Sequence, residues 1–172
     1  MKKTLIVVDF QNDFVYGPLG TDEAKAIVPN VQKKIEEYRE RGDSVIFTMD
    51  YHNKYYLGTH EGRYLPVEHC VGGTDGFRLV IHAEWGEYLA DKSAFGYDKW
   101  WTYAPLLEDC SQIELVGVCT DICVVSNTLI LRSLFPEVDI VVDASCCAGT
   151  TPEKHKAALE VMKSCHIDII NE

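Results

Sequence analysis

Short apolar runs alternate along this chain with segments of helical periodicity, and this alternation is the strongest constraint on its fold. The apolar runs lie at 4–9, 44–49, 88–91, 112–118, 138–142 and 166–170. Because most of them are continuously apolar, they predict strands that are buried on both faces of a sheet. Strands that alternate with helices favour right-handed βαβ units. The sequence therefore predicts an α/β fold with three layers (α/β/α) around a mostly parallel, Rossmann-like sheet of about six strands.

The segments between these runs predict helices at 22–41, 104–110, 121–134 and 152–164. In the first helix, apolar residues recur at steps of three or four, at Ile27, Val31, Ile35 and Tyr38. Gly42 then provides a C-terminal cap. No internal repeat, linker or change in composition divides the 172 residues. We therefore expect a single domain over 1–172.

Charge and cysteine content exclude several classes of partner and site. The chain has 16 Lys and Arg against 27 Asp and Glu, a formal net charge of −11. Such an acidic protein repels phosphate backbones, so no nucleic-acid partner is expected.

No stretch approaches the roughly 18 apolar residues of a membrane span, and no targeting signal is visible. The seven cysteines lie mostly in apolar runs, which favours reduced thiols and a cytoplasmic location.

Candidate functional residues directly follow the predicted strands. Asp9 ends the first strand, Lys92 follows the third, and Cys123 begins the helix after 112–118. Ligands bind at the carboxyl ends of strands in open parallel sheets, so these side chains could share one site. A helix N-terminus also lowers the pKa of a thiol and offers N–H groups to an oxyanion. Taken singly, the three could equally be a capping carboxylate, a solvated surface lysine and a small buried cysteine.

A second group of candidates frames the long loop over 50–76. Asp50 and His52 come directly after a predicted strand, and His69 lies near the end of the loop. Glu61 or its neighbour His60 could add a further ligand. Three or four such ligands with open positions are typical of a catalytic divalent-metal site. The spacing alone leaves open the alternative, a loop held by ordinary hydrogen bonds.

These candidates occur in motifs that resemble those of the isochorismatase-like cysteine hydrolases and, within them, the nicotinamidases. The motifs are VVDFQNDF at 7–14, DYH at 50–52, HCVGGTDG at 69–76, KSAF at 92–95 and GVCTDICV at 117–124. The first and last are quite specific together, and the resemblance covers nearly the whole chain. It implies the isochorismatase-like hydrolase fold, in which helices sandwich a parallel sheet.

The resemblance also implies a catalytic triad of Asp9, Lys92 and Cys123. Cys123 would attack an amide carbonyl as a thiolate and form a thioester, and Asp9 would pass the thiol proton to the leaving ammonia. Lys92 would hold the Asp9 charge in place and favour the thiolate. The peptide bond between Val118 and Cys119 would be cis. The main-chain N–H groups of Cys119 and Cys123 would hold the oxyanion.

By the same resemblance, Asp50, His52 and His69 would be metal ligands, with Glu61 as the fourth and His60 as its rival. A divalent zinc, manganese or iron ion at this position would bind the pyridine nitrogen of nicotinamide and orient its carboxamide.

The resemblance is less complete in the substrate pocket. Phe14, together with Tyr64 or Tyr97, would line the ring pocket. Leu65 stands where an aromatic residue is often found, and Cys119 stands where alanine is commonest in the family. Both substitutions bear on the identity of the substrate rather than on the triad.

These observations together predict a cytoplasmic enzyme of NAD salvage that hydrolyses nicotinamide to nicotinate and ammonia. Because members of the family commonly form homo-oligomers, we expect the same of this chain. Three alternatives stay open. The same triad could act on another small amide, a carbamoyl compound or an isochorismate-like vinyl ether. The chain could be an inactive relative that acts as a binding protein. It could also be a signalling or nucleotide-binding module, although no Gly-rich phosphate loop is present.

Overall fold

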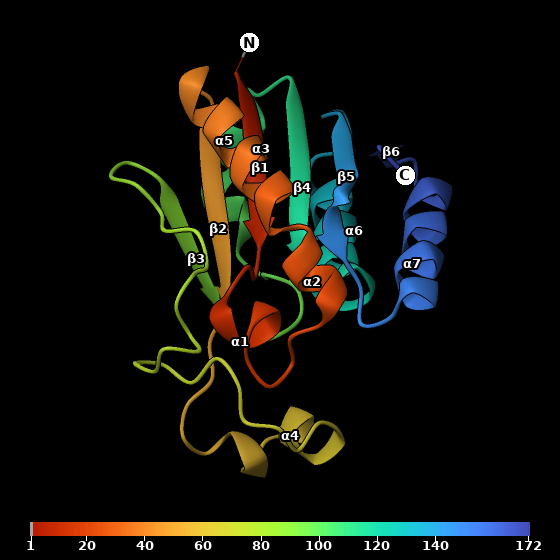
Figure 1. The fold of residues 1–172 in the computed structure, drawn as a ribbon. Helices are drawn as coiled ribbons and strands as arrows, with labels where there is room; N and C mark the ends of the chain where they lie inside the picture. Colours follow the sequence, from red (N-terminus) through yellow and green to blue (C-terminus); the bar gives the residue numbers. More distant parts are fainter. Residues whose placement is uncertain (1) are drawn as a thin grey trace.

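A six-stranded sheet forms the centre of the molecule. The computed structural model describes residues 2–172. The strands are β1 (Lys3–Val8), β2 (Ser44–Asp50), β3 (Tyr88–Lys92), β4 (Gln112–Val118), β5 (Ile140–Ala148) and β6 (Asp168–Ile170). They lie in the order β3-β2-β1-β4-β5-β6, and every neighbouring pair is parallel (Figure 1). The predicted parallel, Rossmann-like sheet is confirmed.

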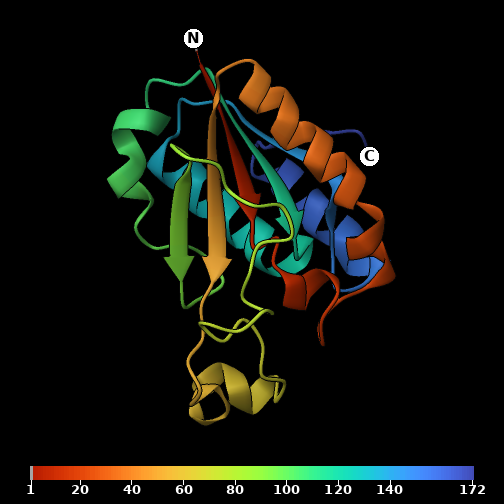
Figure 2. The same ribbon diagram turned by 60° about the vertical axis from the view of Figure 1, so that its left-hand side comes forward.

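Helices cover both faces of the sheet and complete three layers (Figure 2). One face carries α1 (Asn12–Val15), α2 (Asp22–Ala26) and α3 (Val28–Glu40), and the other carries α5 (Ala104–Leu107), α6 (Val125–Leu134) and α7 (Pro152–Ser164). Along β1, Leu5 and Val7 point into the first core, whereas Ile6 and Val8 point into the second. This alternation is the period-two pattern of a strand buried on both faces.

The helix predicted over 22–41 is interrupted. α2 ends at Ala26, and α3 begins at Val28 with Pro29 in its first turn. A proline has no N–H to donate, and its ring clashes with the carbonyl four residues earlier. The chain therefore restarts its helix at Val28 and places Pro29 in the first turn, where proline is favoured.

Other boundaries also differ from the predictions. The segment predicted as one helix over 121–134 starts as a π-helical turn, Thr120–Val124, before α6. The helix predicted over 104–110 is the short α5, preceded by a 3₁₀ turn at Trp100–Tyr103. β5 runs to Ala148 instead of ending at residue 142, because its second half pairs with β4 beyond a register shift. That half consists of small residues, which give no strand signal.

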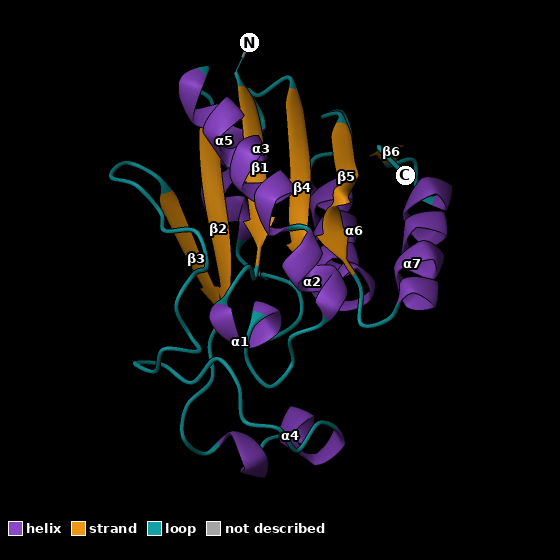
Figure 3. Cartoon of the chain, viewed as in Figure 1, coloured by secondary structure: helices purple, strands orange, loops and turns teal. Residues whose placement is uncertain are grey.

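The connection from β2 to β3 projects beyond the carboxyl ends of the strands. It is mostly loop, with a 3₁₀ turn at Tyr56–Gly58 and the short α4 (His60–Tyr64) at its far end (Figure 3). This is the long loop that the sequence predicts to be functional. Its position brings it over the sheet edge at which β1, β2, β3 and β4 end.

Among the described residues, no helix combines the length and the apolar character that crossing a membrane requires.

Candidate active site

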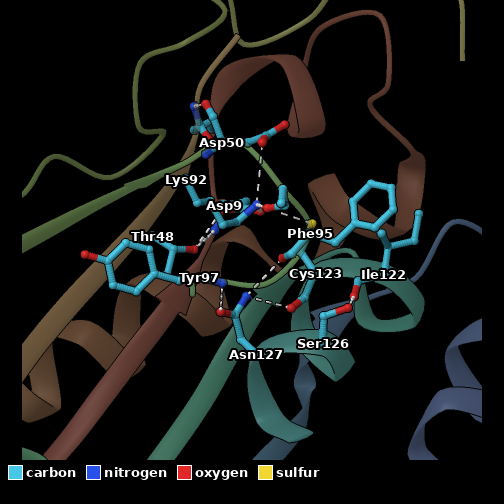
Figure 4. Close-up of polar contacts among 12 residues, drawn as sticks. Asp9, Thr48, Asp50, Lys92, Phe95, Tyr97, Ile122, Cys123, Ser126 and Asn127 are labelled. Atoms are coloured by element: carbon cyan, nitrogen blue, oxygen red, sulfur yellow. Dashed lines mark hydrogen bonds and ion pairs between the residues drawn. The ribbon is translucent and has the colours of Figure 1, made fainter. Parts of the chain in front are cut away.

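Three side chains from different elements meet at the carboxyl edge of the sheet. Asp9 follows β1, Lys92 ends β3, and Cys123 lies in the turn after β4 (Figure 4). Lys92 Nζ lies 2.6 Å from Asp9 Oδ2 and 3.6 Å from Cys123 Sγ. All three residues are buried. The folded chain thus brings together the three residues of the predicted triad, with the ammonium next to both the carboxylate and the thiol.

β2 fixes the orientation of the Asp9 carboxylate. The Thr48 hydroxyl donates to Asp9 Oδ1 at 2.6 Å, and the Asp9 N–H lies 3.1 Å from the same hydroxyl oxygen. Asp9 has a φ of 46°, in the left-handed region that aspartate enters more readily than most residues. The chain therefore turns out of β1 at this residue, and the second carboxylate oxygen faces Lys92.

Burial and mutual charge set the protonation of the three groups. Burial raises the pKa of Asp9 above its ordinary value, although the Lys92 ammonium opposes this. Burial also raises the pKa of the Cys123 thiol, and the Asp9 charge adds to the effect. Burial alone would lower the pKa of Lys92, but the charge of Asp9 raises it above the ordinary value. The resting cluster therefore holds a protonated lysine, a protonated thiol and a carboxylate with increased proton affinity.

The turn that carries Cys123 is anchored from the far side of the site. Asp121 accepts hydrogen bonds from the Thr150 N–H at 2.7 Å and from the Thr150 hydroxyl at 2.6 Å. The peptide bond between Val118 and Cys119 is cis, as the family resemblance implies. These features hold the main chain of residues 118–123 against the loop that follows β5.

A second cluster lies beside the first, at the end of β2 and in the loop that follows. Asp50, His52, Glu61 and His69 each offer a ligand atom, and these atoms all lie within 4.8 Å of one another. The Nε2 atoms of His52 and His69 lie 2.9 and 3.4 Å from Asp50 Oδ2, and 3.8 and 3.7 Å from Glu61 Oε1. His60, by contrast, is exposed on α4 and accepts a hydrogen bond from Arg63. Glu61 rather than His60 is therefore the fourth member of the cluster.

The chemistry of this cluster suits a divalent cation. His69 Nδ1 lies 2.8 Å from the Val67 carbonyl oxygen, so its N–H donates there and Nε2 is available as a ligand. His52 Nε2 is buried and has no hydrogen-bond partner among the described residues, although it lies close to Asp50. Two imidazoles and two carboxylates form a donor set suited to zinc, manganese or iron.

The Asp50 carboxylate joins the two clusters, because its Oδ1 lies 3.5 Å from Lys92 Nζ. Burial would raise the pKa of Asp50, but the adjacent imidazoles of His52 and His69 and the Lys92 charge hold it well below the ordinary value. Asp50 is therefore ionised, as a metal ligand must be.

A cavity of about 280 Å³ is lined by members of both clusters. This volume is close to the lower end of the range for small-molecule pockets, roughly 300–1,000 Å³. Asp50, Glu61 and His69 line one part of it, and Cys123 lines another. The rest of the wall is mainly apolar, from Phe14, Leu19, Ala24, Leu65, Phe95, Val118, Ile122 and Ala148. A ligand in this cavity meets a thiol and a group of potential metal ligands across an apolar space.

Two of the four residues predicted for the ring pocket do not line this cavity. Phe14 and Leu65 do. Tyr64 is 80% exposed at the solvent side of the short α4 and lines an adjoining outer hollow. That hollow shares Glu61, Leu65, Phe95 and Ile122 with the cavity. Tyr97 is buried in the core against Trp100, with ring centroids 5.1 Å apart, because its loop folds back onto α6. Phe95, in the same loop, contributes the aromatic wall instead.

Comparison with known proteins identifies the family. The isochorismatase domain model matches residues 3–171. The chain belongs to the isochorismatase family. It is 29% identical to the nicotinamidase/pyrazinamidase of Mycobacterium tuberculosis over 98% of each chain. It is 30% identical to a probable inactive nicotinamidase of Arabidopsis thaliana, over 93% of this chain and 87% of that protein.

A solved structure agrees with this assignment. The pyrazinamidase of Pyrococcus horikoshii in complex with zinc is 25% identical and has a TM-score of 0.86, and the match covers all of both chains. The prediction of an isochorismatase-like protein that is most similar to the nicotinamidases is confirmed. These relatives also support a hydrolase that acts on amide C–N bonds.

Two buried amides at this isochorismatase-family site were not among the predicted residues. Gln11 Oε1 accepts from the Asp50 N–H at 2.7 Å, and its Nε2 donates to the Asp50 carbonyl at 3.0 Å. Asn127, one turn after Cys123 in α6, donates to the Cys123 carbonyl at 2.8 Å. Gln11 lies within the VVDFQNDF motif, whereas Asn127 follows Ser126 in a helix and carries no comparable signal.

Proposed function

We propose that this protein hydrolyses nicotinamide to nicotinate and ammonia through a thioester on Cys123. The proposal is carried by the position of Lys92 Nζ, 2.6 Å from Asp9 Oδ2 and 3.6 Å from Cys123 Sγ, at a cavity that also contains potential metal ligands. Similarity to nicotinamidases and pyrazinamidases supports the choice of substrate. We further propose that residues 1–172 form one isochorismatase-like domain. A homo-oligomeric assembly stays a prediction.

The first half of the reaction forms the thioester. Asp9, whose pKa burial raises, takes the proton of the Cys123 thiol. The thiolate attacks the amide carbonyl carbon, and a C–S bond forms while the carbonyl electrons move to oxygen. The main-chain N–H groups of Cys119 and Cys123 stabilise this oxyanion. The electrons return, the C–N bond breaks, and the nitrogen leaves as ammonia with the proton from Asp9.

The second half releases the acid. Asp9, again ionised, takes a proton from a water molecule that attacks the thioester carbon. The C–S bond then breaks, and the thiolate regains its proton from Asp9. The acid loses its remaining proton to solvent, which leaves nicotinate and the starting enzyme. Lys92 stays protonated throughout, because the negative charge of Asp9 or of the Cys123 thiolate raises its pKa. Its ammonium stabilises whichever of the two neighbours, Asp9 or the Cys123 thiolate, carries the negative charge.

The second cluster accounts for substrate orientation. Asp50, His52, Glu61 and His69 would hold a divalent ion, which when bound supplies an electrophilic anchor for the pyridine nitrogen of nicotinamide. Between that cluster and Cys123, the apolar wall that includes Phe14 and Phe95 excludes water from the ring. The carboxamide is thereby directed toward the thiol.

One relative is described as probably inactive, so activity itself must be measured. The experiment is ammonia release from nicotinamide by zinc-reconstituted protein, beside a panel of other small amides and carbamoyl compounds. We expect release from nicotinamide that falls at least 10³-fold in Cys123→Ala. Cys165→Ala, at the end of α7, is the matched control and keeps wild-type rates.

The outcomes separate the parts of the proposal. Release from nicotinamide that persists in Cys123→Ala contradicts the thioester mechanism. Cys123-dependent release from another compound, but not from nicotinamide, supports the thioester mechanism and excludes nicotinamide as the substrate. No release from any compound identifies an inactive relative.

A further inference from the structure

Asn127 uses its whole hydrogen-bonding capacity on the two segments that carry Cys123 and Lys92. Its Oδ1 accepts from the Tyr97 N–H and from the indole N–H of Trp100, both at 2.9 Å. Its Nδ2 donates to the Cys123 carbonyl at 2.8 Å and to the Phe95 carbonyl at 3.2 Å. The residue is fully buried. A buried amide with two donors and two acceptor sites all satisfied holds its partners in one arrangement.

The loop that Asn127 holds begins at Lys92. Lys92 Nζ donates to the carbonyl of Ala94 at 3.0 Å, so the position of this loop helps to fix the position of the ammonium. Asn127 binds the main chain of the next residues, at Phe95 and Tyr97. Gly96, between them, packs so closely on α6 that a Cβ would collide with the Ile130 side chain. The loop thus rests directly on the helix that carries Asn127.

We propose that Asn127 is a positioning residue, which fixes the separation between the Cys123 thiol and the Lys92 ammonium. The inference rests on the proposed cysteine mechanism. Cys123 and Lys92 belong to different elements, and their 3.6 Å contact requires that the turn after β4 and the loop after β3 keep a fixed distance. Asn127 is bonded to both segments, as the close-up shows (Figure 4). Without this bridge, the ammonium no longer stabilises the thiolate that forms on Cys123.

The test compares Asn127→Ala and the nearly isosteric Asn127→Asp with Thr128→Val. Thr128 is a matched control, because it is also fully buried in α6 and also donates to a carbonyl four residues earlier, that of Val124, at 2.7 Å. It does not line the cavity and has no bond to the loop in the structure. Thr128→Val removes a similar hydrogen bond from a side chain to the main chain of the helix. It leaves the hydrogen bonds between Asn127 and the loop after β3 intact.

Two readouts report on positioning. The first is the steady-state hydrolysis of nicotinamide by the zinc-reconstituted enzyme. We expect kcat to fall at least tenfold in both Asn127 variants, with KM changed less than threefold, and to stay within twofold in Thr128→Val. The second is the rate at which iodoacetamide alkylates Cys123, followed by mass spectrometry of its peptide. We expect this rate to fall at least fivefold in the Asn127 variants alone.

Equal losses of kcat in the Asn127 and Thr128 variants would overturn the proposal, and so would wild-type alkylation of Cys123 in both Asn127 variants. If neither Asn127 variant folds, as judged by circular dichroism, the residue is structural and the proposal is also wrong. The alkylation readout needs no substrate. It therefore decides the role of Asn127 even if nicotinamide proves not to be the substrate.

Discussion

Lys92 shows how far single residues can be interpreted before the chain is folded. A lysine directly after a weak strand is usually solvated. Its place at a strand end made Lys92 only a candidate, and the family resemblance gave it a specific role. In the folded protein it is buried between two carboxylates, with Nζ 2.6 Å from Asp9 and 3.5 Å from Asp50. An unpaired buried charge costs several kcal/mol. The ammonium is therefore stable in this position only because β1 and β2 bring their carboxylates to the same sheet edge.

His52 and His60 give a matched pair for the metal site, because both lie in the same loop and only His52 belongs to the cluster. We expect His52→Ala to lower zinc affinity at least tenfold and to raise KM for nicotinamide more than it lowers kcat. His60→Ala should bind zinc as the wild type does. The measurement is zinc content after dialysis against graded chelator, by atomic absorption. Equal zinc retention in the two variants would remove His52 from the site.

At the scale of the elements, the position of Asp9 depends on how closely β1 approaches β4. Gly117 has a φ of 119°, and a Cβ at this residue would collide with the main chain of Val8, its partner in the sheet. The register of β4 with β5 shifts next to the same glycine. This irregular stretch directly precedes the turn that carries Cys119 and Cys123. Strand periodicity predicts β4 but contains no signal for the close approach.

We expect Gly117→Ala to lower the free energy of unfolding by about 1–3 kcal/mol, because it combines an unfavourable φ with a main-chain collision. Gly58→Ala is the control. A Cβ at Gly58 meets open space, so its effect should stay within about 0.5 kcal/mol. Urea unfolding of the two variants and the wild type measures the difference. Indistinguishable transition midpoints would contradict the close approach of β1 and β4.

At the scale of the whole molecule, a buried ionic cluster away from the active site joins α3 to β4 and β5. Lys34 Nζ lies 2.7 Å from Glu114 Oε1 and 2.8 Å from Asp143 Oδ2. The Tyr38 hydroxyl donates to Glu114 at 2.6 Å. Burial would raise the pKa of Asp143, but the hydrogen bond and charge of Lys34 and the hydrogen bond of Ser145 lower it below the ordinary value. Periodicity marks Tyr38 only as a core residue of its helix and gives no sign of the ionic cluster, since its contacts join three elements distant in the chain.

This cluster predicts a specific loss of stability in acid. Because the pKa of Asp143 is lower in the folded than in the unfolded state, its contribution is complete above the unfolded value of about 3.9. The contribution is lost as pH falls from there through the folded pKa, since the unfolded chain then binds more protons. We expect Asp143→Asn to destabilise the protein at pH 7 and to weaken the dependence of unfolding free energy on pH below about 4.

The exposed Asp109 provides the control for this prediction. Asp109→Asn should follow the wild-type curve of unfolding free energy against pH, measured by urea denaturation from pH 7 to pH 3. Parallel curves for the wild type and Asp143→Asn in acid would contradict the role assigned to Asp143.

The sequence by itself determined the α/β class, the parallel sheet and the strand ends at which candidate residues gather. These features follow from periodicity and from the rule that strands of a parallel sheet end at one edge, both of which can be evaluated along the chain. The sequence motifs also predicted membership of the isochorismatase family, which the comparisons confirm.

Only the tertiary structure decided which neighbour in a loop or helix faces the site. It selected Glu61 over His60, replaced Tyr97 by Phe95 in the cavity wall, and revealed Asn127 between Cys123 and the loop after β3. A side chain in an irregular segment takes its direction from contacts with elements that lie far away in the chain. Periodicity carries no information about these contacts, because they form only when the sheet and its helices have packed.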